Sequence, residues 1–235
     1  AYEIKECDWS SDVCSSDLAN EPRNMAMVVP KGGPVKTPAD LKGKRVGVST
    51  AGSLTDWLVR ATSKRMGWGP EGITSVPTGD VRIRNIMMKN GDLEGSVTAI
   101  EEGKDYEESG QGFVLMNFGE TAPDFHTHVI FATDPFVKNR PDVLRNFLKG
   151  WFQTVAFMRD NRAATVKSIA KTTNYSEKII DLSYDTEMQM ISFDGAFSPK
   201  ALDFLRNSFQ ELEILDRVPD VKEIYHPGFA PVSIK

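Results

Sequence analysis

The chain has 235 residues, of which 40% are hydrophobic and 26% are charged, a balance typical of folded globular domains. It contains no apolar run near the roughly 20 residues that a membrane helix needs, so no membrane span is expected. Its 28 basic and 33 acidic residues give a net charge of -5, and they form no basic stripe that would follow a phosphate backbone. Nucleic acid is therefore not an expected partner.

The beginning of the chain has an unusual origin. Residues 8–18 match, residue for residue, the translation of a common sequencing-library adapter. We therefore expect residues 1–18 to be an artefactual, disordered tail, with the natural sequence starting near Ala19 and any signal peptide lost. A natural tail rich in Ser and Asp is the alternative. Both cysteines, Cys7 and Cys14, fall in this stretch, which removes any argument from disulfides or thiol chemistry.

Strands and helices alternate from residue 25 to residue 100. Apolar runs bounded by Gly and Pro predict strands, and the stretch after Asp80 predicts a capped helix. The expected strands are 25–29, 45–49, 72–76 and 93–100, and the expected helices begin at Leu54 and Val81. Strand and helix in this alternation favour right-handed crossovers and a mostly parallel sheet.

The junction after the strand 45–49 is the best candidate for a binding site. Ser49 and Thr50 end the strand, and Ser53 stands three residues before Asp56, which is a capping-box spacing. The free N–H groups of the first helical turn would point at a small anion beyond the strand. A helix cap with no ligand is an equally good interpretation of this fragment alone.

The second half of the chain predicts mainly helices. A strand is expected at 129–132, and Pro141 starts a long helix with an apolar stripe that includes Phe147, Trp151 and Val155. Three further helices follow, and this half has too few strands to form its own sheet.

Several motifs, in this order and spacing, resemble one known family. They are the strand 25–30, the run Leu41-Lys-Gly-Lys-Arg-Val-Gly-Val48, the turn 90–94, and the segment from Val129 to Leu144. Together they resemble the substrate-binding proteins of ABC importers in the nitrate, sulfonate and taurine group, which also includes binders of thiamine precursors. The resemblance implies an α/β, periplasmic-binding-protein-like fold of type II, with two lobes, mixed parallel sheets flanked by helices, and an incomplete first lobe.

The resemblance also implies a division of the chain and a site. Residues 19–29 would be a first-lobe remnant and hinge strand, 30–120 the second lobe, and 121–235 the mostly helical return to the first lobe. The positions that match the family's ligand cleft are Ser49, Thr50, Gly52, Ser53 and Thr55. Hydroxyl and N–H groups suit a sulfonate or carboxylate there, while Asp56 is expected to act only as a cap partner.

The strand after Glu94 departs from the family pattern. Many relatives carry an aromatic residue followed by Glu and Pro near the strand end, whereas this chain reads Gly95-Ser-Val-Thr-Ala-Ile-Glu101. Thr98 and Glu101 would therefore leave a smaller, more polar wall that favours an amine-bearing or differently shaped ligand.

Other chemistry is weaker. His126 and His128 share a face of an extended strand, but no third ligand is apparent, so neither a metal nor a cofactor is expected. Arg82, Arg84 and Lys89 could lean toward an anion, but a solvated helix face is the preferred interpretation. No catalytic constellation stands out.

The sequence thus predicts a monomeric, extracytoplasmic or periplasmic binding protein, not an enzyme. It would deliver a small polar organic solute or an oxyanion to an ABC permease. Two alternatives share the fold. One is the effector domain of a transcription regulator, and the other is an enzyme similar to the synthases of the thiamine pyrimidine precursor.

Overall fold

The computed structural model describes residues 12–20, 22–122, 125–211 and 215–234, and within these the chain divides into two compact units. Unit 2 consists of residues 21–123 and 162–190, and unit 1 of residues 1–20, 124–161 and 191–235. Within the described residues, no helix combines the length and the apolar composition needed to cross a membrane.

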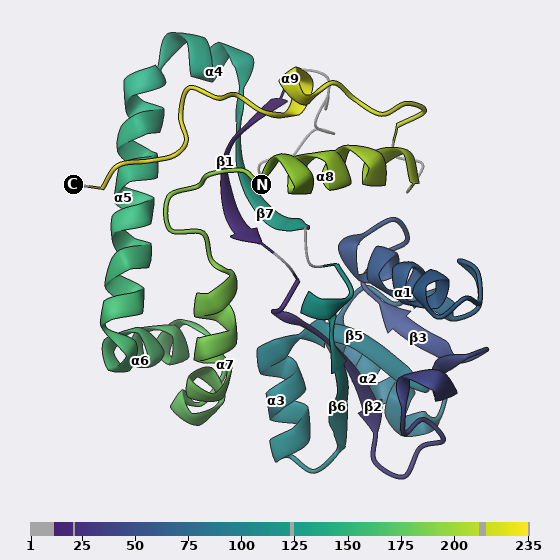
Figure 1. Ribbon diagram of the computed structural model, residues 1–235. Helices are drawn as coiled ribbons and strands as arrows, with labels where there is room; N and C mark the ends of the chain where they lie inside the picture. Colours follow the sequence, from purple (N-terminus) through teal and green to yellow (C-terminus); the bar gives the residue numbers. More distant parts are fainter. Residues whose placement is uncertain (1–11, 21, 123–124, 212–214, 235) are drawn as a thin grey trace. The chain divides into compact units, whose positions relative to one another are not determined.

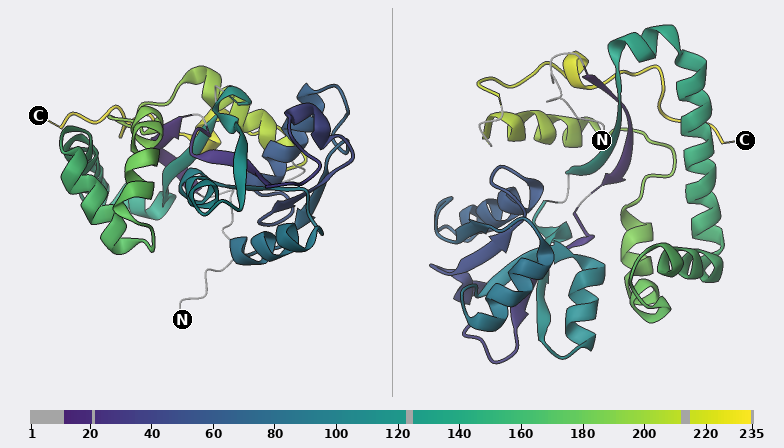
Figure 2. Two further views of the ribbon diagram at one scale, coloured as in Figure 1. Left: turned by 90° about the horizontal axis from the view of Figure 1, so that it is seen from below. Right: turned by 180° about the vertical axis from the view of Figure 1, so that it is seen from behind.

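Unit 2 is built on a five-stranded sheet in the order β4-β3-β5-β2-β6, shown in Figure 1 and from two other directions in Figure 2. β3 is parallel to β4 and β5, whereas β2 runs antiparallel to β5 and β6. The strands are β2 (Met25–Pro30), β3 (Arg45–Val48), β4 (Thr74–Pro77), β5 (Gly95–Ala99) and β6 (Gly112–Asn117). The sheet is therefore mixed, as the fold class predicts.

Helices cover both faces of this sheet. α1 connects β3 to β4, and α2 returns from β4 past β3 to β5, so right-handed crossovers put these two helices on opposite faces. α3 packs on the same face as α2, because Val28 of β2 clusters with Met88 of α2 and Tyr106 of α3. The helices are α1 (Leu54–Arg65), α2 (Val81–Asn90) and α3 (Ile100–Glu108), preceded by a short 3-10 helix, η1 (Pro38–Leu41).

Local sequence explains where these helices begin and end. Ser53 caps α1 and accepts the N–H of Asp56, and Asp80 caps α2 and accepts the N–H of Arg82, as the sequence predicts. Gly91 ends α2 in the left-handed conformation, with φ of 80°, which costs glycine little.

Two elements of unit 2 were not expected. The acidic run 101–108 lies in the helix α3, because Gly103 and Tyr106 form a buried face against the sheet. Accordingly, the strand expected to reach residue 100 ends at Ala99. β6 then adds the edge strand next to β2.

The expected division of the chain is also corrected. Residues 21–29 lie in unit 2, because β2 is paired on both sides inside its sheet. Residues 162–190, expected in the first lobe, also cluster with unit 2. They form α6 (Arg162–Thr172) and α7 (Glu177–Met190), and Lys178 on α7 forms an ion pair with Glu108 on α3.

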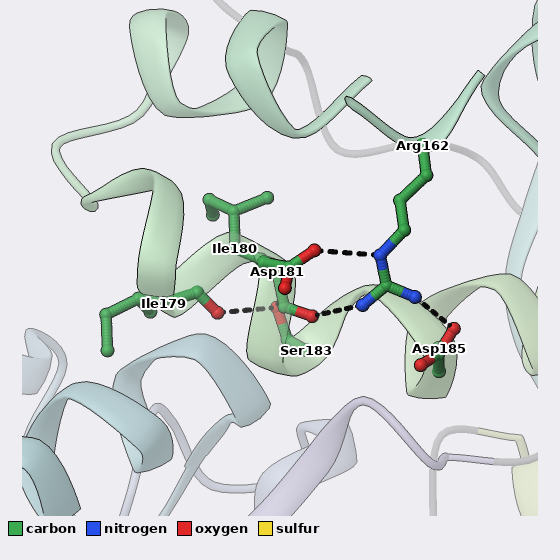
Figure 3. Close-up of polar contacts among 6 residues, drawn as sticks. All are labelled: Arg162, Ile179, Ile180, Asp181, Ser183 and Asp185. Atoms are coloured by element: carbon green, nitrogen blue, oxygen red, sulfur yellow. Dashed lines mark hydrogen bonds and ion pairs between the residues drawn. The ribbon is translucent and has the colours of Figure 1, made fainter. Parts of the chain in front are cut away.

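A single arginine joins α6 to α7, as Figure 3 shows. The Arg162 guanidinium donates to the Asp181 carboxylate at 2.8 Å, to the Asp181 carbonyl at 2.9 Å and to the Asp185 carboxylate at 2.7 Å. It also lies 4.6 Å from the centroid of the Tyr184 ring. Because all three nitrogens are engaged, this residue fixes the angle between the two helices.

Unit 1 has a two-stranded antiparallel sheet of β1 and β7. The prediction that residues 1–18 form an unpacked tail is wrong for residues 12–18, because they pair with β7; residues 1–11 lie outside the described residues. Backbone pairing needs no particular side chains, and this pairing contains three register shifts. The strands are β1 (Asp12–Asn20) and β7 (His126–Thr133).

Helices and the C-terminal segment complete unit 1. Leu144, Leu148 and Phe152 on α5 pack with Phe229 of the C-terminal segment to form the apolar cluster of unit 1. In the right-hand view of Figure 2 this segment crosses α5 on its way to the C-terminus. Phe147 and Trp151, which lie beside this buried stripe of α5, are 51% and 41% exposed. The helices are α4 (Asp134–Asn139), α5 (Pro141–Asp160), α8 (Pro199–Glu211) and α9 (Val221–Ile224).

Candidate functional site

The carboxyl ends of β3 and β5 and the starts of α1 and α3 meet at one edge of the unit 2 sheet. Ligands of open α/β sheets bind at such an edge, where helix N-termini present free N–H groups. All the predicted site residues lie in unit 2 near this edge, on the β3–α1 junction or near the start of α3.

At the β3–α1 junction, three hydroxyl groups form a cluster. Ser49 Oγ donates to Ser53 Oγ at 3.0 Å, and Thr55 Oγ1 lies 2.9 Å from both of these oxygens. Thr55 Oγ1 also accepts the N–H of Ser49 at 2.9 Å, and Ser53 Oγ donates to the Thr50 carbonyl at 2.7 Å. The structure therefore brings Ser49, Ser53 and Thr55 together, and their contacts fix the shape of the junction.

Gly52 and Asp56 close the turn. Gly52 has φ of +73°, a left-handed conformation that side chains disfavour, and its N–H donates to the Asp56 carboxylate at 2.9 Å. Asp56 is only 6% exposed. It therefore acts as a cap partner, as expected, and not as a ligand group.

These internal bonds decide which donors are left for a ligand. The protons of Ser49 Oγ and Ser53 Oγ are already donated inside the junction. Within residues 22–122, the N–H groups of Leu54 and Thr55 and the exposed hydroxyl of Thr50 have no hydrogen-bond partner. The junction thus offers two backbone N–H groups of a helix N-terminus and one hydroxyl, a set that suits an anionic oxygen.

Thr98 and Glu101 do not share a wall. Thr98 is 3% exposed on β5, and it faces α3, because its antiparallel partner Ala26 lies 3.7 Å from a Cβ placed on Gly103. Glu101 is on the first turn of α3, one residue after the helix begins. The expectation of a continuous strand is thus wrong here, because the backbone turns into a helix at Ile100.

The start of α3 carries a group of carboxyls whose pKa values are raised. Burial raises the pKa of Glu101 and of Glu102. On α7, burial and then the charge of Glu101 raise the pKa of Glu187 to about 7. Burial, followed by the negative charges of these carboxyls, raises the pKa of Tyr175 to about 12. Glu187 is therefore partly neutral near pH 7, which reduces its repulsion of an anion nearby.

The two histidines lie in different surroundings. His126 is 3% exposed and packs against the Phe197 ring at 4.8 Å, whereas His128 is exposed. In the part of the chain that the structure describes, no three His, Cys, Asp or Glu side chains are grouped so that they could hold a metal ion.

Sequence reasoning misjudged the burial of one residue near this edge. Arg84, interpreted as part of a solvated helix face, is 6% exposed. Its position four residues after the cap Asp80 and four before Met88 places it on the inner side of α2. Because the residue is charged, the helical periodicity was not recognised as a sign of burial.

Comparison with known proteins identifies the family. Residues 16–164 match the family described as NMT1/THI5 like, so the chain belongs to this family. No curated protein sequence matches the chain.

Solved structures show the fold. The ligand-binding component of an ABC-type import system from Staphylococcus aureus is similar with a TM-score of 0.78 and 14% identity, over 96% of this chain and 76% of that chain. The periplasmic aliphatic sulphonate binding protein SsuA from Escherichia coli gives 0.76 and 18%, over 92% and 70%. The desulfurization enzyme DSZB gives 0.68 and 14%, over 94% and 78%. The periplasmic-binding-protein-like fold of type II is thereby confirmed.

Proposed function

We propose that this chain is the solute-binding component of an ABC-type importer, and that it binds a small organic solute through an anionic oxygen group. The oxygens are held at the β3–α1 junction of unit 2. The single observation that carries the proposal is the set of unpartnered donors there: the N–H groups of Leu54 and Thr55 and the Thr50 hydroxyl.

The junction combines a rigid frame with neutral donors. The hydroxyl cluster holds the turn, so little ordering is needed when a ligand binds. Neutral donors stabilise an anion by direct hydrogen bonds without forming an ion pair. Such a site releases its ligand readily, which a delivery protein requires.

The structural neighbours support a solute of the sulfonate type. One is named for binding aliphatic sulphonates, and another is named as the ligand-binding component of an importer. In the proposal the chain works outside the cytoplasm as a monomer, without a cofactor, and its partners are this solute and a membrane permease. Because the desulfurization enzyme DSZB has a similar fold, the absence of catalysis is part of the proposal.

The proposal can be tested by calorimetric titration of the 235-residue chain with 1-butanesulfonate, taurine and nitrate. Thr50→Ala removes a free hydroxyl and should weaken binding of the preferred solute by about 1 to 2 kcal/mol, the range for one hydrogen bond to a charged group. Ser53→Ala should weaken binding by a similar amount, because the turn loses the contacts of this hydroxyl with Ser49, Thr50, Thr55 and Asp56.

Ser109→Ala is the matched control. Ser109 donates to the Tyr106 carbonyl at 3.1 Å at the far end of α3, so its loss should leave the affinity unchanged. Equal affinity in the wild type and in both junction variants would place the solute elsewhere.

A further inference from the structure

Arg84 on α2 is a buried cation whose side chain lies against β3 of the unit 2 sheet. It is 6% exposed, whereas the side chain of Arg82, two residues earlier, is 85% exposed. A Cβ on Gly47 of β3 would lie 2.9 Å from Arg84 Cδ and 3.0 Å from Arg84 Cγ. The missing side chain of Gly47 therefore makes room for the Arg84 stem under the end of β3.

The charge of Arg84 has few partners. Its Nη1 donates to the Gly79 carbonyl at 3.3 Å, and its Nε has no partner. The nearest negative groups are Glu102 and Asp80, and within the described ranges neither forms an ion pair with it. Asp80 is already bound by the Arg82 guanidinium at 3.1 Å and 2.8 Å. An uncompensated buried cation is costly, and such groups gather at functional sites.

A short path of hydrogen bonds connects Arg84 to the β3–α1 junction. Arg84 donates to the carbonyl of Gly79, and the N–H of Gly79 donates to the carbonyl of Ser49 at 2.8 Å. Thr98 Oγ1, also without a partner, is on the same face of the sheet as Gly47, because Gly47 is paired with Ser96 and Thr98 follows two residues later. Two polar atoms without partners, Arg84 Nε and Thr98 Oγ1, thus lie beneath the edge where the solute is proposed to bind.

We propose that Arg84 is a positioning residue whose buried charge makes the β3–α1 junction select an oxyanionic solute, of the sulfonate type, over a neutral solute of the same shape. This inference rests on the proposed function. The direct bonds come from the neutral donors of the junction, and the Arg84 charge acts on the anion through a medium of low dielectric constant, where screening is weak. The solute anion then supplies the countercharge that Arg84 lacks.

The test compares two probes that differ in charge and hardly in shape, 1-butanesulfonate and the neutral 1-butanesulfonamide. Both are titrated calorimetrically into the 235-residue chain and its variants. Arg84→Met should weaken binding of the sulfonate about tenfold and change binding of the sulfonamide less than twofold. Arg84→Lys keeps the charge and should retain the sulfonate affinity within about threefold.

Arg82→Met is the matched control, because it removes the same charge from the exposed side of the same helix. It should leave both affinities unchanged. Gly47→Ala keeps the charge but displaces the Arg84 stem, so it should lower the sulfonate affinity to a value between those of the wild type and Arg84→Met. If circular dichroism shows that Arg84→Met does not fold, Gly47→Ala and Arg84→Lys decide the question.

Three results would overturn the inference. If Arg84→Met weakens binding of both probes equally, Arg84 has only a structural role. If Arg84→Met and Arg82→Met change the affinities equally, the effect comes from the net charge of the protein and not from the position of Arg84. A wild type that prefers the sulfonamide would overturn the inference while leaving solute binding intact. If the wild type binds neither probe, the proposed sulfonate-type function fails as well, and this is known before any variant is compared.

Discussion

The sheets of the two units are held together in different ways. In unit 2, β2 is paired on both sides, four of its six residues are buried, and its pairing has no register shift with β5 and one with β6. In unit 1, β7 pairs with β1 through three register shifts, and it exposes 55% of Phe131. In unit 2, side-chain packing on both faces of the sheet favours a single register.

This difference indicates that unit 2 provides the well-ordered frame that a binding site needs. Unit 2 holds its β3–α1 junction on a sheet packed on two faces, which is the kind of frame that keeps donors in place. Unit 1 relies on one side of α5 for its apolar cluster.

The buried side of α5 should carry most of the stability of unit 1. Phe152 is 0% exposed, and Phe152→Ala should lower the free energy of unfolding by about 3 to 5 kcal/mol, because it removes a buried ring and leaves a cavity. Phe157→Ala, on the same helix with 54% exposed, should cost less than about 1 kcal/mol. Calorimetric unfolding measures both, and similar losses would mean that α5 is not one-sided.

The contact of α7 with α3 in unit 2 should depend on pH through Glu187. Its pKa is raised to about 7 in the folded protein, against roughly 4.3 in an unfolded chain. The folded state therefore binds more protons between these values, and stability falls as the pH rises through this window.

Glu187→Gln keeps the shape of the neutral carboxyl group and removes the loss of stability at high pH. At pH 8 the variant should be more stable than the wild type by on the order of 2 kcal/mol, and near pH 4 the two should be equal. Glu177→Gln, on the same helix and exposed, should show no such gain. Parallel pH profiles of the Glu187→Gln variant and the wild type in denaturant unfolding would refute the assignment.

The helix cap at the β3–α1 junction should contribute a smaller amount. Ser53→Ala should lower the stability of unit 2 by about 1 kcal/mol through loss of the cap. Thr50→Ala should change it by less than about 0.5 kcal/mol, since the Thr50 side chain has no hydrogen bond within residues 22–122. Thermal unfolding of the two variants distinguishes Ser53, which stabilises the turn, from Thr50, which is proposed to bind the solute. Equal losses of stability would show that the two residues have the same role.

The exposed side of α5 should affect association more than stability. Phe147 and Trp151 lie with ring centroids 6.2 Å apart and form an exposed apolar patch. Replacing both by Ser should change the free energy of unfolding by less than about 0.5 kcal/mol but reduce binding of a hydrophobic dye. Leu182→Ser, at a single exposed position on α7, should leave dye binding unchanged. Undiminished dye binding by the double variant would place the apolar surface elsewhere.

Local signals in the sequence predicted the frame of the candidate site. Ser53, Asp80 and Gly91 specify the ends of α1 and α2 by short-range hydrogen bonds and by a left-handed residue, so they can be recognised without tertiary information. The order of strands and helices up to residue 100 follows from apolar periodicity in the same way. These signals depend only on neighbours along the chain.

The rest depends on contacts between distant residues. The charges of residues 101–108 concealed the buried face that Gly103 and Tyr106 give to α3. The burial of Arg84 depends on the missing side chain of Gly47 on β3, and the membership of 162–190 in unit 2 depends on contacts of α7 with α3. Periodicity within one segment carries none of this information.

The most direct test of the account is a nuclear magnetic resonance titration of the isotopically labelled 235-residue chain with 1-butanesulfonate. The account predicts that the largest amide shifts occur at Leu54 and Thr55, the donors without partners at the start of α1. Smaller shifts should follow at Gly79, which is bonded to Ser49. Saturable shifts confined to other residues, or none at all, would contradict the claim that this junction holds the solute.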